Sequence, residues 1–364
     1  MATACALLLP APEARACGAL VQPQTGSLGA DAQRAFFSVR GDRTEVVLQV
    51  MVPQTTQDFG VLVPMPAQPT VSADPVDVSE LDALDEATRP VILEDTGDTG
   101  PSCGCGGALA GDARNGVDVG QQLVVGPVEV VTLTGEDGSA ITAWLNEHGF
   151  TIPAAQQSTV DSYAGAGHWF VAFKRAQTSG SISAVGVQLT LPGDQRGYAL
   201  KMARIGAGEE MSFVIFVSHT AGVAPSFPYA ALTLHDLDKA TVRHDGYAAA
   251  VRQAVAAHEG RAFVIEGIRD RNALALGSRL QALTEPNHKI TRLSSTMKPA
   301  DLTADVTLNA PPPEDVPASL DVSTGTVGGP HGNPGGGPGL LLLTTIMLLL
   351  WSTARRSIRV PHAT

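Results

Sequence analysis

The sequence predicts an α+β protein of mainly antiparallel β-sheet with a few short helices, followed by a disordered spacer and one C-terminal transmembrane helix. Three observations lead to this fold class. Strand-like runs follow one another across short turns instead of alternating with helices, which disfavours a doubly wound parallel sheet. Residues 311–338 are rich in Pro, Gly, Ser and Thr. Residues 339–354 form a Leu-rich run without charges.

The predicted strands are runs of β-branched, aromatic and other apolar residues bounded by turn residues. The first two form a hairpin around Gly41 and Asp42, and Pro64 ends the third. Strands are expected at residues 34–40, 44–52, 58–63, 128–134, 168–174, 182–191, 198–205, 211–217 and 262–266.

The predicted helices carry start and stop signals. Ser79 is a suitable N-cap for the first helix, and Pro90 stops that helix. Gly149 closes the second helix because glycine readily adopts the conformation that ends a helix. Helices are expected at residues 79–88, 139–148, 154–163 and 246–258.

The N-terminal residues 1–16 are predicted to be a signal peptide. A short apolar run ends before Ala14, Arg15 and Ala16, which fit a small-x-small cleavage site. No basic residue precedes the run, so an ordinary disordered N-terminus is the alternative. A lipoprotein-type cysteine at Cys17 is a further alternative, although the residues before it do not suit a lipobox.

The exported body is expected to cover residues 17–310, and it could divide into two sub-domains near residues 95–120. That stretch is rich in Gly and Asp, which favours a loop. The spacer at residues 311–338 has almost no large apolar residues, so it cannot bury a core. The chain is therefore organised as leader, body, spacer, membrane segment and basic tail.

Residues 339–354 are predicted to cross a membrane. The run is slightly shorter than the roughly 20 residues that a bilayer core requires. Snorkelling arginines and local thinning of the bilayer would make up the difference. A buried core helix is the alternative. The apolar residues on which the prediction depends are Leu340, Leu343, Ile346, Leu350 and Trp351.

The basic tail at residues 355–364 sets the expected topology. Arg355, Arg356 and Arg359 follow the span directly, which places the C-terminus in the cytoplasm and the body outside. Gly335 to Gly337 resemble the glycine-rich sorting signals that rhomboid-type proteases cut. A single-pass envelope protein and a body released to the surface by a sorting protease both remain open.

Composition limits the partners and cofactors. The 364 residues carry a formal net charge of -12, which disfavours binding to phosphate backbones, so no nucleic acid is expected. The sequence contains no phosphate-binding loop, no nucleophile elbow and no zinc-protease motif. No cofactor and no metal are predicted.

The cysteines are the sharpest local feature. Cys103 and Cys105 are separated by one residue and cannot readily close an unstrained disulfide with each other. A bridge from Cys17 to one of them is therefore the preferred interpretation in an oxidising compartment. A thiol-redox or metal role and a free or intermolecular thiol are the alternatives.

Three polar residues form the candidate site of a rival, enzymatic interpretation. His219, His235 and Asp236 could act as acid and base if the fold brought them together. His235 and Asp236 lie in a charged region that reads as a turn, where solvated surface is the simpler explanation. No catalytic residue is assigned.

Several short segments, in this order, resemble the bacterial domain of unknown function family 2330. The resemblance covers about residues 16–310 and implies export, but it supplies no catalytic residues. The sequence departs from the family pattern at Gly60, in a motif where an aromatic residue is expected two places further along. The segments are ACG at 16–18, DFGVLVPMP at 58–66, LDAL at 81–84 with Thr88, AWL at 143–145, FVAFK at 170–174, ITRL at 290–293 and LTAD at 302–305.

The functional hypothesis is a membrane-tethered, surface-displayed binding or structural protein of the bacterial envelope, with a protein or glycan ligand that the sequence does not identify. The absence of a catalytic motif and the presence of a tether favour it. The alternatives are an envelope hydrolase with a site assembled from distant residues, and a thiol-redox protein that uses Cys103 and Cys105.

Overall fold

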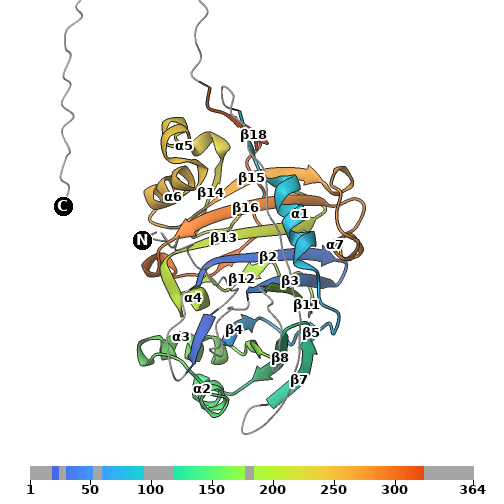
Figure 1. The fold of residues 1–364 in the computed structure, drawn as a ribbon, viewed down its shortest axis with the longest axis vertical. Helices are drawn as coiled ribbons and strands as arrows, with labels where there is room; N and C mark the ends of the chain where they lie inside the picture. Colours follow the sequence, from blue (N-terminus) through green and yellow to red (C-terminus); the bar gives the residue numbers. More distant parts are fainter. Residues whose placement is uncertain (1–18, 24–29, 52–59, 94–117, 177–183, 324–364) are drawn as a thin grey trace, which may run out of the picture. The chain divides into compact units, whose positions relative to one another are not determined.

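The computed structural model describes residues 19–23, 30–51, 60–93, 118–176 and 184–323. All of them belong to the first of two units, which ends at Ser323. Two sheets dominate this unit, and short helices cover their outer faces (Figure 1). The prediction of a mainly β-sheet protein with several short helices is confirmed.

The larger sheet has eight strands among the described residues. Its neighbours pair mostly antiparallel, but β13 runs parallel to β2 and β14 runs parallel to β15. The order across the sheet is β14 (Ala230–Thr233), β15 (Ala262–Asp270), β16 (Lys289–Met297), β13 (Ala207–His219), β2 (Ala30–Arg40), β3 (Arg43–Met51), β11 (Ala184–Pro192) and β5 (Thr70–Val71).

The smaller sheet has six strands among the described residues, and all of its pairs are antiparallel. A tight turn joins its first two strands at Gly126, whose φ of 58° is a conformation that glycine adopts without strain. The order is β7 (Asp118–Val125), β8 (Val128–Thr134), β10 (Trp169–Arg175), β4 (Gly60–Met65), β1 (Ala19–Pro23) and β9 (Phe150–Thr151).

Two short ribbons complete the described strands. In the first, β12 (Gly197–Tyr198) pairs antiparallel with β17 (Val306–Thr307). In the second, β6 (Val91–Leu93) pairs parallel with β18 (Ser319–Asp321). The first ribbon borders the candidate site.

The period of two in the strands explains how the sheets pack. Val46 and Leu48 on β3 join the central core, whereas Val47 between them faces the other side of the larger sheet. Likewise, Phe173 on β10 joins the central core and Phe170 faces the other side of the smaller sheet. The two sheets therefore share one apolar core, and each also has an apolar outer face that needs a cover.

Helices provide these covers (Figure 1). The outer face of the smaller sheet packs against residues of α2 (Gly138–Glu147), α3 (Gln157–Ala164) and α4 (Leu200–Ala203). The outer face of the larger sheet packs against α1 (Val78–Thr88) and α7 (Ser278–Ala282). Apolar residues of α5 (Lys239–Asp245) and α6 (Tyr247–Ala257) join the central core. Four short 3-10 turns are also described, at Ala154–Gln156, Leu234–Asp236 (η2), Arg271–Ala273 and Pro299–Asp301.

Two predicted segments differ from the structure. Residues 198–205 are not a strand: they contain the end of β12 and the helix α4, in which Leu200 and Ala203 lie one turn apart and are both buried. The charged region that reads as a turn contains α5, because the Asp238 carboxylate accepts from the backbone N–H groups of Ala240 and Thr241 and caps the helix.

The folded body extends past the predicted boundary at residue 310. Leu320 and Val322 are 2% and 0% exposed and belong to the central core, although the sequence predicts spacer there. Among the helices of the described residues, we find none with the length and hydrophobicity that a bilayer crossing requires. The predicted membrane segment, residues 339–354, lies outside the described residues.

Candidate functional site

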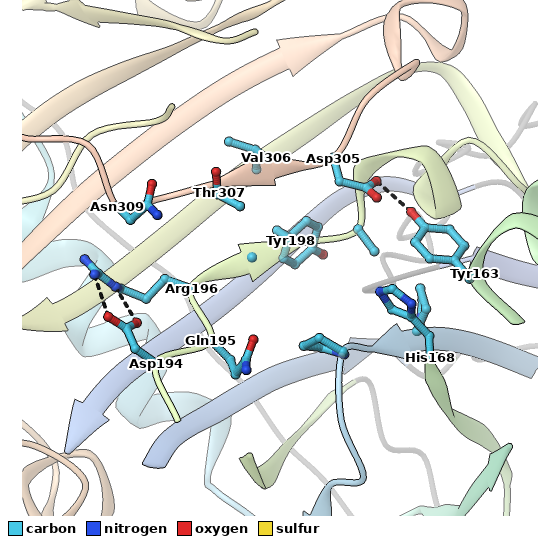
Figure 2. A pocket seen from close by; sticks show the side chains of 14 residues that line it. Tyr163, His168, Asp194, Gln195, Arg196, Tyr198, Asp305, Val306, Thr307 and Asn309 are labelled. Atoms are coloured by element: carbon cyan, nitrogen blue, oxygen red, sulfur yellow. Dashed lines mark hydrogen bonds and ion pairs between the residues drawn. The ribbon is translucent and has the colours of Figure 1, made fainter. Parts of the chain in front are cut away.

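A cleft of about 280 Å³ lies where the β12–β17 ribbon meets the end of β4 and the segment between α3 and β10. Pro64 and Pro66 line it from β4 and the residue just beyond, Tyr163 lines it from α3, and His168 lines it from the segment between α3 and β10. Figure 2 shows Tyr163, His168 and Asp305 gathered at one end, and Asp194, Arg196 and Asn309 at the other. The cleft therefore has two polar ends joined by the ribbon.

Asp305 organises the first end. Tyr163 Oη donates to Asp305 Oδ1 over 2.6 Å, and the Lys201 backbone N–H donates to the same oxygen over 3.0 Å. Lys201 Nζ lies 3.4 Å from Asp305 Oδ2 and 4.7 Å from the centre of the Tyr163 ring. The carboxylate is thus compensated by a cation and held by two donors.

Tyr163 acts in this cluster as a permanent hydrogen-bond donor. Burial of the ring raises the pKa of its hydroxyl far above the usual value, and the negative charge of Asp305 raises it further. The hydroxyl therefore stays protonated at neutral pH. A tyrosine in this state can fix an acceptor but cannot serve as a nucleophile or a base.

His168 packs edge-on against Tyr163, with ring centres 5.2 Å apart. Burial lowers the pKa of the imidazole, and it outweighs the opposing charge of Asp305, so the ring is neutral at pH 7. Its Nδ1 atom is buried and has no hydrogen-bond partner in the described part of the chain. Because this atom is enclosed by the protein, it offers no contact to a ligand in the cleft.

The second end is built by a bidentate ion pair. Arg196 donates from Nε and Nη2 to the two carboxylate oxygens of Asp194, each over 2.7 Å, and from Nη1 to the Leu308 carbonyl over 3.2 Å. The Arg196 side chain is only 10% exposed, so its guanidinium is a fixed brace between two segments of the cleft wall. Asn309 beside it accepts a hydrogen bond from the Ser226 hydroxyl.

The charged groups of the cleft are already paired within the protein. Each cation at the cleft is paired with a carboxylate, Tyr163 is held protonated, and no activated nucleophile lines the cleft among the described residues. The described residues also contain no group of three or more side chains that could hold a metal ion. The site offers fixed donors and acceptors without net charge.

The fold does not bring the three rival site residues together. His219 Nδ1 accepts from the Ala221 backbone N–H over 3.2 Å, at the end of β13. His235 Nε2 lies 3.2 Å from an Asp315 oxygen in an exposed pair. The Asp236 carboxylate accepts from the Thr233 backbone N–H over 2.7 Å and caps η2. Each of the three has its own local partner, and none lines the cleft.

The neighbour of His219 does contact a histidine. Ser218 Oγ lies 2.9 Å from His288 Nδ1, and burial lowers the pKa of that imidazole. Ser218 is 0% exposed, so no substrate can reach its hydroxyl. The Glu285 carboxylate that could complete a triad accepts from Arg40 Nε over 2.8 Å. The pair therefore satisfies two buried polar groups and supports no hydrolytic site.

The remaining predicted site residues lie outside the described residues. They are the cysteines Cys17, Cys103 and Cys105, the membrane residues Leu340, Leu343, Ile346, Leu350 and Trp351, and the topology residues Arg355, Arg356 and Arg359. Their pairing and placement stay predictions.

The cleft residues were not singled out from the sequence, because they are far apart along the chain and form no local motif. One signal pointed toward them. Two of the segments that carry the family resemblance, residues 58–66 and 302–305, supply Pro64, Pro66 and Asp305 to the cleft. Tyr163, His168 and Arg196 had no such signal.

Comparison with known proteins identifies the family of this chain. The model of DUF2330, described as an uncharacterized protein conserved in bacteria, matches residues 11–309. No curated protein matches. The crystal structure of baculovirus P35 is similar with a TM-score of 0.32 and 10% identity over 77% of this chain and 96% of P35. A mutated P35 after caspase cleavage gives a TM-score of 0.31 and 9% identity over 78% of this chain and 99% of that one. Because the DUF2330 model spans most of the sequence, the chain belongs to this family of uncharacterized bacterial proteins.

Proposed function

We propose that the protein is a ligand-binding module of the bacterial envelope, displayed outside the cytoplasm and tethered by residues 339–354, and that its ligand occupies the cleft beside the β12–β17 ribbon. The observation that carries the binding function is the cleft itself. It gathers fixed polar groups whose charges are already compensated within the protein, and it contains no activated nucleophile among the described residues.

The rigidity of the polar groups supports a preformed binding site. Arg196 is held by three hydrogen bonds and Asp305 by two donors and a cation, so neither side chain has to be ordered when a ligand arrives. A site that is already ordered loses less entropy on binding.

The compensated charges indicate the kind of ligand. Asp194 and Asp305 contribute two negative charges, and Arg196 and Lys201 contribute two positive charges that pair with them. A charged ligand would have to break or compete with these pairs. The ligand is therefore an uncharged molecule, or an uncharged part of a larger one, with several hydrogen-bonding groups.

The placement outside the cytoplasm is supported by the sequence. The predicted leader at residues 1–16, the Leu-rich segment at 339–354 and the arginines after it are consistent with one orientation. Protease treatment of intact and permeabilised cells, followed by mass analysis of the C-terminus, tests this part. Protection of the body in cells with a permeabilised outer barrier and an intact inner membrane would overturn it.

The binding function is tested by filling the cleft. Gly197 is exposed and lines the cleft, and a Cβ added there would come no closer than 3.9 Å to its nearest neighbour, the Val306 carbonyl oxygen. Gly197→Phe should therefore fold and occupy the cleft. Thr70→Phe is the matched control, because Thr70 is an exposed strand residue that does not line the cleft.

The labelled protein and both variants would be applied to an array of random heptapeptides and to an array of neutral glycans. We expect the unmodified protein and Thr70→Phe to bind the same features, and Gly197→Phe to lose that signal by more than about tenfold. If no feature is bound, or if the bound features are insensitive to Gly197→Phe, the cleft is not the ligand site.

A further inference from the structure

The strand β12 has one edge that no other described strand covers. In the two-stranded ribbon it pairs only with β17, with Gly197 opposite Thr307. The Leu308 backbone N–H donates to the Arg196 carbonyl over 2.9 Å, so the pair of residues 196 and 308 is a hydrogen-bonded pair. In an antiparallel ladder the next residue turns its N–H and C=O to the opposite side. Both backbone groups of Gly197 therefore point away from β17.

This free edge borders the cleft. Six consecutive residues, from Asp194 to Ala199, line it. Side chains alternate between the two faces of a strand, so one face alone would present only every second residue. A continuous run of lining residues means that the backbone itself borders the cavity.

The open part of the edge is short and has fixed ends. On one side, the Gln195 backbone N–H donates to Thr44 Oγ1 over 2.8 Å. On the other side, the Ala199 carbonyl accepts from the Met202 backbone N–H over 3.1 Å, where the chain enters α4. Between these two points, the N–H and C=O of Gly197 have no hydrogen-bond partner in the described part of the chain. The open part of the edge can pair with one N–H and one C=O of another chain.

Resting on the proposed binding function, we infer that the ligand of the cleft is an extended peptide segment that adds to the free edge of β12 as a further strand. An extended peptide presents a carbonyl and an N–H of the same residue on one side, which is the complement of what Gly197 offers. Its main chain is uncharged, in agreement with the paired charges of the cleft.

The surroundings of the free edge of β12 favour a peptide over a sugar. The N–H and C=O of Gly197 point away from β17 in the plane of the ribbon, so another backbone can pair with them at the spacing of neighbouring strands, about 4.8 Å. Pro64 and Pro66, which also line the cleft, have no backbone N–H to compete for the peptide carbonyls and offer apolar contact to its side chains. A neutral saccharide shares the hydrogen-bonding chemistry, and it is an outcome of the test below.

The first experiment changes one backbone donor. Gly197 has no positive φ, so Gly197→Ala keeps the fold and the N–H, whereas Gly197→Pro removes the N–H from the free edge without breaking a bond to β17. The probe is a heptapeptide selected on the unmodified protein from a random library. We expect Gly197→Pro to weaken binding about tenfold, the effect of one lost hydrogen bond together with a blocked edge. Gly197→Ala should stay within about threefold.

The second experiment leaves the protein unchanged, so it does not depend on the folding of a variant. N-methyl groups are placed on each amide of the selected peptide in turn. Strand addition predicts that binding is lost when the methyl group is on the one amide that faces the Gly197 carbonyl, and is kept when it is on either neighbouring amide, because those two face away from β12. Hydrogen exchange of the Gly197 amide should also slow when the peptide binds, while the Tyr198 amide, which faces β17, should change little.

The outcomes separate this inference from the proposed function. A neutral glycan that binds in a manner sensitive to Gly197→Phe, with no peptide selected, overturns the peptide inference and supports the binding function. Peptide binding that tolerates N-methylation at every position and Gly197→Pro also overturns strand addition. If neither array gives a signal that Gly197→Phe removes, both proposals fail.

Discussion

Replacing Arg292 by methionine should destabilise the fold strongly, because this side chain compensates two buried carboxylates. Arg292 lies on β16 and is 7% exposed. Its Nε donates to Glu266, which is 1% exposed, and its Nη1 donates to Asp85 of α1. Its guanidinium also lies 5.5 Å from the centre of the Phe216 ring. The charge of Arg292 therefore joins two strands and a helix on the covered face of the larger sheet.

The magnitude follows from what the variant leaves behind. Methionine keeps most of the aliphatic volume, so the packing loss is small. Glu266 would keep its hydrogen bonds from Tyr247 Oη, at 2.6 Å, and from Ser294 Oγ, but would lose the only cation that pairs with it among the described residues. Removing one partner of a buried ion pair costs about 3–5 kcal/mol. This is a large share of the roughly 5–15 kcal/mol that typically stabilises a folded protein.

Urea unfolding at pH 7, followed by circular dichroism, measures this loss. Arg252→Met is the control, because Arg252 pairs with Glu210 in a position where the Arg252 side chain is 49% exposed, and such pairs contribute only about 0–1 kcal/mol. The double variant Arg292→Met/Glu266→Gln should lose less than the sum of the single variants, since it removes both charges together. A cost below about 1 kcal/mol for Arg292→Met, or additive costs in the double variant, would refute this account of the network.

Three further predictions concern stability. Burial raises the pKa of Asp85, but the charges of Arg292 and the neighbouring arginines outweigh burial and lower the pKa overall, so the stability that Asp85 contributes is present above the unfolded-state pKa of about 4 and is lost as the pH falls. Asp85→Asn should therefore reduce the acid-induced loss in a plot of unfolding free energy against pH, and parallel curves for the two proteins would contradict this. Leu84→Ala, at a residue of α1 that is 1% exposed, should cost about 2–5 kcal/mol in urea unfolding, and a cost near zero would mean that α1 does not pack as described. Asp137→Ala should cost about 1 kcal/mol, because the carboxylate caps α2 by accepting from the Ala140 backbone N–H, whereas Asp137→Ser should recover most of it in the same assay.

The sequence was sufficient where one local pattern decides the structure. The strand predicted at residues 128–134 has the same bounds in β8, and the predicted hairpin around Gly41 is formed by β2 and β3. In both cases apolar and turn residues alternate in a way that allows one solution. The helix predicted at 139–148 corresponds to α2, because its cap and its apolar period agree.

Secondary structure was predicted wrongly where polar residues are buried or where an apolar run is short. The strand β16 was not predicted, since Arg292 and Ser294 interrupt its apolar pattern. The buried carboxylates of Glu266 and Asp85 explain why these two side chains face inward. The pairing of β15 and β16 has a bulge before Gly267, which lies opposite Arg292, so Glu266 has no partner residue on β16. No local sequence pattern predicts the direction in which the Glu266 side chain points. Residues 198–205 are apolar enough for either a strand or a helix, and tertiary packing selected the helix α4.

The segments that carry the family resemblance serve two separate purposes in this fold. Arg292, from the segment at residues 290–293, holds β16 in the buried network, and the chain then leads through one 3-10 turn to Asp305, from the segment at 302–305, in the cleft. β16 is thus the fixed element from which Asp305 reaches Tyr163. A change at Arg292 should consequently reduce stability without altering the groups that a ligand meets, whereas a change at Gly197 should alter binding with little effect on stability. Finding these two effects on different residues would separate the positions that maintain the family's fold from those that bind its ligand.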